Sequence, residues 1–144
     1  MERDESLAPL SREHHTTLLL AQLLRLEDPK YKGMPTATVD KAEYATQVFN
    51  NAIQPHFNKE EEILNLVLHH HIDIDIVIQE VFEEHVQLSN LFLNIHENKN
   101  NQKYLAAIGN ALEAHVRKEE RILFPLLQKH CTLQQLQQIH ELLH

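Results

Sequence analysis

Apolar residues recur along four long stretches of the chain at intervals of three and four, the spacing of an amphipathic helix. Segments that contain proline, glycine or asparagine separate these stretches, and such residues are typical of turns. Glycine is rare and leucine, glutamate and glutamine are abundant, which also favours helix over strand. The pattern therefore predicts an all-α chain with long helices over about 11–27, 40–68, 73–97 and 103–128.

Local signals refine this outline. Asp73 or Asp75 is expected to cap the third helix, and Thr132 a short terminal helix. Pro55 lies inside the second helix and should distort it, because proline lacks the backbone N–H. Gly109 in the fourth helix costs helix stability and is expected to allow close packing of a neighbour. The predicted organisation is one domain over 1–144, with a bundle over about 11–128 and an added helix over about 132–143.

A short motif occurs twice on these helices. Residues 56–64 read HFNKEEEIL and residues 115–123 read HVRKEERIL, with the His, the Lys, both Glu, the Ile and the Leu in common. In each copy the His and the first Glu are four positions apart and therefore share one helical face. That spacing alone proves little in a chain with 12 His and 21 acidic residues. Apolar residues continue the same face on both sides of each pair, however, and a buried carboxylate requires a partner or a metal.

The first and third helices add candidate ligands. His85 lies within the apolar stripe of the third helix. His14 and His15 are adjacent on the first helix and point about 100° apart, so only one of them can face the core. His15 shares its line with Leu19 and Leu23, which favours it, and His14 remains the alternative.

The chain resembles the hemerythrin-like proteins with HHE cation-binding domains. The resemblance covers nearly all of 11–128 and is carried by PHFNKEE at 55–61, EEHV at 83–86 and HVRKEERILFP at 115–125. It implies an up-down-up-down four-helix bundle around a non-heme pair of iron ions, bridged by an oxo or hydroxo group. Imidazole and carboxylate without thiolate suit iron or manganese. The resemblance gives as metal ligands His15, His56, Glu60, His85, His115 and Glu119, the two glutamates bridging both ions.

One position departs from the oxygen-carrying hemerythrins. These proteins have a fifth histidine one turn before the ligand of the third helix, and here that position is Val81. Two octahedral ions would then keep two free coordination positions. We therefore expect a protein that binds or senses O₂ or NO. The alternative is an enzyme that reduces peroxide or NO, or a protein that contributes to iron–sulfur cluster repair, and no obvious acid or base near the site separates these possibilities. Glu61 and Glu120 are expected to matter much less than the bridging glutamates.

Composition excludes several classes of partner and location. The formal net charge of −8 argues against nucleic acid and against an anionic membrane surface. The single cysteine, Cys131, excludes an internal disulfide and suits a reducing compartment. The chain has no apolar run near 18 residues and no apolar segment of the signal-peptide type at its start. We therefore expect a cytoplasmic protein whose protein or redox partner is unknown.

Two further histidine motifs carry less weight. Residues 140–144 read HELLH and match the zinc-protease pattern, but they lie at a helix end that is expected to fray. His69, His70 and His71 crowd the end of the second helix. They are expected to be solvated imidazoles, which the negative end of the helix dipole stabilises when they are protonated. Any binding of zinc or nickel by them is expected to be adventitious.

Overall fold

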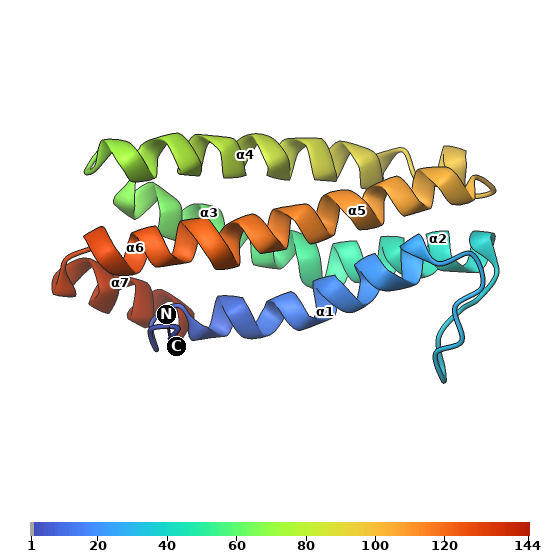
Figure 1. Cartoon of the computed structure of the whole chain (residues 1–144), viewed down its shortest axis with the longest axis horizontal. Helices are drawn as coiled ribbons and strands as arrows, with labels where there is room; N and C mark the ends of the chain where they lie inside the picture. The colour runs from blue at the N-terminus through green and yellow to red at the C-terminus, as the bar shows by residue number, and fades with distance from the viewer. Residues whose placement is uncertain (1) are drawn as a thin grey trace.

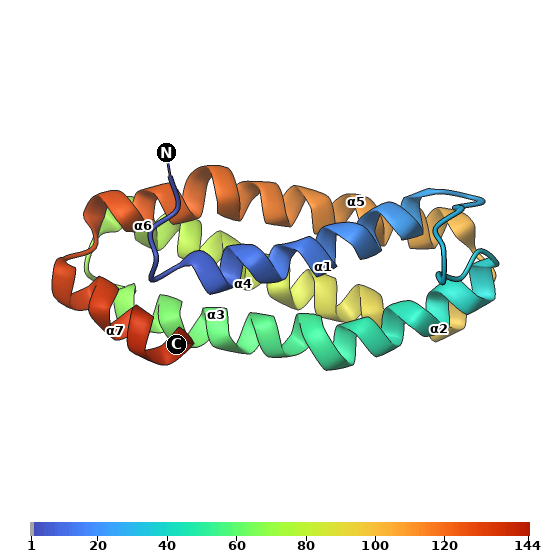
Figure 2. The same cartoon turned by 90° about the horizontal axis from the view of Figure 1, so that it is seen from below.

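A computed structural model describes residues 2–144 as a bundle of four helical rods (Figure 1), and it contains no strand within that range. Successive rods run in opposite directions, and a shorter helix, α7, lies across the end where both termini are found (Figure 2). The predicted up-down-up-down bundle with an added terminal helix is confirmed. The rods are α1 (Ala8–Arg25); α2 (Thr38–Val48), η1 (Phe49–Ile53) and α3 (Gln54–Val67); α4 (Ile72–Leu93); and α5 (Gln102–Lys118), η3 (Glu119–Leu123) and α6 (Phe124–His130). A 3₁₀ turn, η2 (His96–Asn98), precedes α5, and α7 spans Leu133–Leu143.

The closest helix pair in the bundle is α1 with α5. A Cβ atom added at Gly109 would lie 2.5 Å from the carbonyl oxygen of Ala21 and 2.8 Å from Cγ of Arg25. Both distances are shorter than a carbon atom tolerates, so the approach of these two helices requires glycine. The expected role of Gly109 is confirmed.

Each of the two long composite rods contains a π-helical turn immediately before a proline. The N–H of Gln54 donates to the carbonyl of Phe49, five residues back, and Pro55 follows. The same arrangement ends η3, just before Pro125. A proline ring collides with the carbonyl four residues back, and the wider turn gives that carbonyl room. The distortion expected at Pro55 therefore takes the form of a π-helical turn.

Helix caps agree only in part with expectation. The Thr132 hydroxyl accepts from the N–H of Gln135, and the Gln135 side chain accepts from the N–H of Thr132, so the predicted cap of α7 is confirmed as a capping box. The prediction that Asp73 or Asp75 caps α4 is wrong, because His71 occupies that position. Asp75 instead accepts a hydrogen bond from the N–H of His69 in the preceding turn.

The hydrophobic core has two parts, separated along the bundle by a polar layer. One part, which includes Leu24, Phe57 and Leu112, fills the end formed by α2 and the start of α5. The other, which includes Ile63 and Leu127, fills the end covered by α7. Each rod passes from one part to the other at buried polar side chains. These are His14, His56, Glu60, His85, His115 and Glu119.

None of the helices within residues 2–144 has the length and apolar character needed to cross a membrane.

We predict that Gly109→Ala destabilises the protein although alanine is the better helix former. The gain in helix propensity is about 1 kcal/mol, whereas forcing a methyl group into a packed contact costs about 1–3 kcal/mol. Chemical denaturation should therefore give a lower free energy of unfolding. The control is Asn110→Ala at the exposed neighbouring position, which should stabilise by up to about 0.7 kcal/mol. Equal stabilisation by both substitutions would mean that α1 and α5 are farther apart.

Candidate metal centre

Six buried side chains from all four rods converge in the polar layer. They form two groups, and the potential ligand atoms within each group all lie within 4.8 Å of one another. All six side chains are at most 4% exposed, and both glutamates are completely buried. The two groups share these glutamates, so the geometry brings together two adjacent sets of potential ligands with both carboxylates in common. The first group is His14, His56, Glu60 and Glu119, and the second is Glu60, His85, His115 and Glu119.

The prediction that His15 faces the core is wrong. His14 is 3% exposed, and its Nε2 lies 2.9 Å from Oε1 of Glu119, whereas His15 is exposed. The line of His15 and Leu19 is apolar for a different reason: it lines a small cavity beneath the segment after α1, beside Tyr31 and other residues. Helix α1 thus carries two apolar lines: the one with His14 reaches the polar layer, and the one with His15 faces α2 and the segment before it.

The other five predicted residues lie together as the sequence placed them, and their imidazoles point inward through Nε2. That atom of His85 is 2.9 Å from Oε1 of Glu60. The Nε2 of His56 lies 3.3 Å from Oε2 of the same carboxylate. The Nε2 of His115 lies 3.5 Å from Oε1 of Glu119. All four histidines therefore direct the same ring atom at the two shared carboxylates.

A second set of carboxylates surrounds the first. The Nδ1 atom of each histidine forms a hydrogen bond with a glutamate of the preceding rod in the chain. For His14, on the first rod, the glutamate comes from the last rod, so the four pairs form a closed ring. A carboxylate that accepts from Nδ1–H fixes the tautomer and leaves the Nε2 lone pair free for a metal. We call these four side chains the peripheral carboxylates. The pairs are Glu13 with His56 at 2.9 Å, Glu61 with His85 at 2.8 Å, Glu84 with His115 at 2.7 Å and Glu120 with His14 at 2.8 Å.

Basic side chains hold some of the peripheral carboxylates from outside. Lys118 lies 3.0 Å from Glu84, and Lys59 lies 3.2 Å from Glu13. Burial alone would raise the pKa of Glu84, but hydrogen bonds from His115 and Lys118 hold that pKa below its ordinary value. The pKa of Glu13 is lowered for the same combination of reasons, with its own histidine and lysine. These carboxylates therefore stay ionised and able to accept from Nδ1–H.

The two shared carboxylates strongly affect each other. Burial and the negative charge of Glu60 raise the pKa of Glu119 well above its ordinary value. Burial would also raise the pKa of Glu60, but the neighbouring Glu119 and the imidazoles of His56 and His85 hold that pKa well below its ordinary value. Without a metal, the closeness of the two buried carboxylates therefore favours the protonated form of Glu119. Divalent cations would take the place of that proton and remove the repulsion.

Four buried atoms of the two groups have no hydrogen-bond partner: Oε2 of Glu60, Oε2 of Glu119, Nε2 of His56 and Nε2 of His115. Buried polar atoms are nearly always paired in folded proteins, so four in one layer require an explanation. A pair of cations would satisfy them. The donor set, imidazole and carboxylate without thiolate, suits iron or manganese, so the residues present fit such a pair.

Apolar rings close the layer on both sides. The ring of Phe57 stacks on His85 with centroids 3.9 Å apart, and Phe124 stacks on His14 at 5.8 Å. Val81, one turn before His85, is completely buried. These side chains keep water away from the polar layer, which strengthens every electrostatic interaction within it.

Sequence reasoning missed the peripheral carboxylates and treated Glu61 and Glu120 as remote. A signal for them exists: each one is adjacent in sequence to a predicted or observed ligand, as Glu84 is to His85. Adjacent residues on a helix point about 100° apart, so a neighbour of an inward ligand faces the next rod. The carboxylate of that neighbour therefore contacts Nδ1 of the histidine on the next rod.

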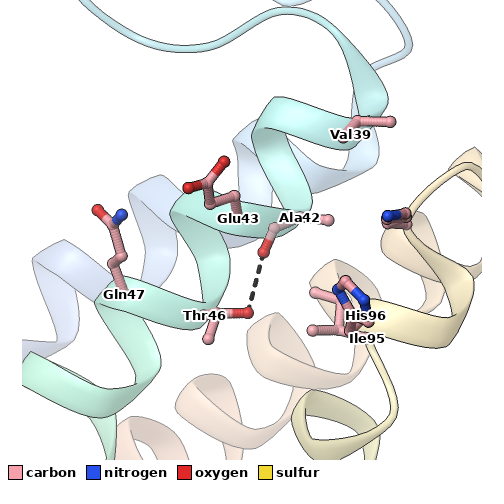
Figure 3. A pocket seen from close by; sticks show the side chains of 8 residues that line it. Val39, Ala42, Glu43, Thr46, Gln47, Ile95 and His96 are labelled. Carbon is pink, nitrogen blue, oxygen red and sulfur yellow. Dashed lines mark hydrogen bonds between the residues drawn. The ribbon is translucent and has the colours of Figure 1, made fainter.

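Two surface grooves differ in how close they come to this layer. A groove of about 450 Å³ runs between α2 and residues 95–99, where the Thr46 hydroxyl donates to the carbonyl of Ala42 (Figure 3). None of the six converging side chains lines it. A second groove of about 380 Å³ between α4 and α5 does reach His115 and Glu84. This groove brings solvent to the edge of the polar layer.

The terminal H-E-x-x-H motif has a different environment. The rings of His140 and His144 stack at 3.8 Å, and Nε2 of His144 lies 3.1 Å from the carbonyl oxygen of Glu5. Within the part of the chain that the structure describes, no group of potential metal ligands includes either histidine.

Comparison with known proteins agrees with this geometry. Residues 5–127 match the family described as the hemerythrin HHE cation-binding domain. No curated protein and no solved structure matches the chain. The matched segment contains all four rods up to α6 and every residue of the polar layer. The chain therefore belongs to the hemerythrin HHE cation-binding family.

Proposed function

We propose that this protein binds two iron ions in the polar layer and uses them to bind or sense a diatomic ligand, O₂ or NO. The observation that carries the proposal is the pair of ligand groups that share Glu60 and Glu119 and contain four unpartnered buried atoms. Proteins of this family bind cations, and small ligands such as O₂ are typical of the family. The proposed ligands are His14, His56, Glu60, His85, His115 and Glu119.

Two features of the polar layer would favour the binding of divalent cations. The peripheral carboxylates fix each histidine so that Nε2 meets the ion, and the shared carboxylates supply negative charge between the two positions. Together with the peripheral carboxylates they give the layer a strongly negative potential. Such a potential favours divalent cations over neutral occupants.

Ferrous ions in these positions would supply electrons and free coordination sites for a diatomic ligand. Val81, buried one turn before His85, cannot ligate and adds an apolar wall to a layer enclosed by Phe57 and Phe124. Enclosure favours retention of an apolar diatomic molecule and excludes water.

The hydrogen bonds of the peripheral carboxylates favour reversible binding of a diatomic ligand over its catalytic reduction. Reduction of peroxide or NO consumes protons and therefore needs an acid that is free to deliver them. Each of the four peripheral carboxylates is already engaged with a histidine Nδ1. The shared carboxylates would be engaged with the ions. A reductase, or a protein of iron–sulfur cluster repair, is the alternative function. A chain with the single cysteine Cys131 has no internal disulfide, which suits a reducing compartment such as the cytoplasm.

We predict that His14→Ala loses roughly half or more of the iron, because one of the two positions loses an imidazole. His15→Ala at the exposed neighbouring position should leave the iron content unchanged. Elemental analysis of protein refolded with ferrous iron measures both. Loss of iron on substitution of His15 alone would restore the original assignment, and absence of iron from the unmodified protein would refute the central proposal.

We predict that Glu84→Gln weakens iron binding about 10–100-fold, because the neutral amide accepts from Nδ1–H of His115 more weakly than the carboxylate and no longer raises the basicity of that imidazole. Circular dichroism should show an unchanged helical content. Glu83→Gln is the matched control, since Glu83 is the exposed neighbour on the same helix. Competition with a chromophoric ferrous chelator gives the affinities. Identical affinities for the two variants would show that the peripheral carboxylates do not position the ligands.

We predict that Val81→His keeps its iron but binds one azide fewer than the unmodified protein. The new imidazole would occupy one free coordination site, and a buried polar group with such a partner costs little stability. Optical titration of the oxidised protein with azide measures the stoichiometry. An unchanged stoichiometry and spectrum would mean that position 81 does not face the ions.

The same preparation separates binding from catalysis. Anaerobic ferrous protein mixed with NO should bind it stoichiometrically and release it on removal of free NO. Continuous consumption of NO or peroxide in the presence of a reductant would instead identify an enzyme.

A further inference from the structure

We propose that His71, Asp73 and His130 form a second metal site, which binds a single exchangeable Zn²⁺ ion at the end of the bundle covered by α7. These three residues come from the start of α4 and the end of α6. Their potential ligand atoms all lie within 4.8 Å of one another. The site shares no residue with the polar layer, so it does not depend on the proposed iron centre.

The two imidazoles are already close together. Their rings stack with centroids 3.9 Å apart and an angle of 30° between their planes. Nδ1 of His71 is buried and has no hydrogen-bond partner. A buried ring nitrogen in this condition is unfavourable unless a ligand or proton partner occupies the space beside it. A metal ion coordinated by this nitrogen would remove that cost.

The backbone holds His71 in place. His69, two residues earlier, adopts the left-handed conformation with φ of 72°, which is unfavourable for a residue other than glycine. Its N–H donates to Oδ1 of Asp75 at 2.9 Å, so the turn is fixed by a side chain of the helix that follows. His71 is the N-cap of that helix. The ligand is therefore presented by a braced turn and not by a loose segment.

The donor set selects the ion. Two imidazoles and one carboxylate, with water in the fourth position, are a common tetrahedral environment for Zn²⁺. Zinc ligands lie 2.0–2.1 Å from the ion and hence about 3.3 Å from one another, which rotation of the half-buried rings and of the exposed Asp73 can achieve. Cys131 follows His130 but is not in the group. The absence of thiolate makes the ion exchangeable.

The position of the site suggests what the ion does. An ion held by His71 and His130 would connect the first turn of α4 to the last residue of α6. Helix α7 begins three residues later and packs on α3. Zinc would therefore stabilise the junction from which α7 departs, in proportion to the concentration of free ion.

The test is a calorimetric titration of the full chain with Zn²⁺, after the protein has been loaded with iron and desalted. The unmodified protein should bind one more Zn²⁺ than His130→Ala, and the affinity of Asp73→Asn should fall at least tenfold. The matched control is His70→Ala at an exposed position of the same turn, and it should bind like the unmodified protein. Iron content, measured separately, should be the same in all four proteins.

Equal zinc uptake by the unmodified protein and by His130→Ala would overturn the proposal, as would an equal loss in His70→Ala, which would indicate adventitious binding by any surface imidazole. Asp73 is exposed and can be replaced without disturbing the core, so Asp73→Asn decides the matter if His130→Ala fails to fold. Because the comparison is a difference between variants, it holds whether or not the polar layer contains iron.

Discussion

Two completely buried carboxylates, Glu60 and Glu119, impose the main constraint on this bundle. Removing two such groups from water costs many times the net stability of a domain unless charge and hydrogen bonds compensate. The bundle compensates by interrupting its core with a whole polar layer, to which every rod contributes. The two hydrophobic clusters on either side are thus consequences of that layer as much as causes of folding.

The peripheral carboxylates connect all four rods through one ring of hydrogen bonds. Because each histidine is oriented by a glutamate of another rod, no single helix can be displaced without misplacing a ligand that belongs to its neighbour. The ring also links the four rods in chain order and back to the first. Packed apolar side chains can adapt to small shifts between helices, whereas these hydrogen bonds are directional and hold only over a narrow range of distance and angle.

How far the sequence predicts this structure depends on the kind of interaction involved. The spacing of apolar residues and the positions of turn-forming residues are sufficient to predict the four rods and five of the six converging side chains. The buried face of a helix can be recognised from the sequence of that helix alone. The choice between His14 and His15 required knowledge of what covers the second apolar line of α1, and that cover comes from α2 and the segment before it. The peripheral carboxylates depend on contacts between rods, as between Glu61 and His85, which one helix's pattern does not contain.

The π-helical turn η3 means that the two copies of the repeated motif are not equivalent. His56 and Glu60 lie together in regular α-helix after a π-helical turn, whereas Glu119 is the first residue of one. Beyond it Ile122 is 47% exposed while Leu123 is completely buried, although the corresponding Ile63 and Leu64 of the first copy are both buried. The extra residue in the turn rotates everything after it by about 100°. The internal symmetry visible in the sequence is therefore broken in space, and the two groups of potential ligands, one with His56 and the other with His115, are not equivalent: they would hold two cations with unequal affinity.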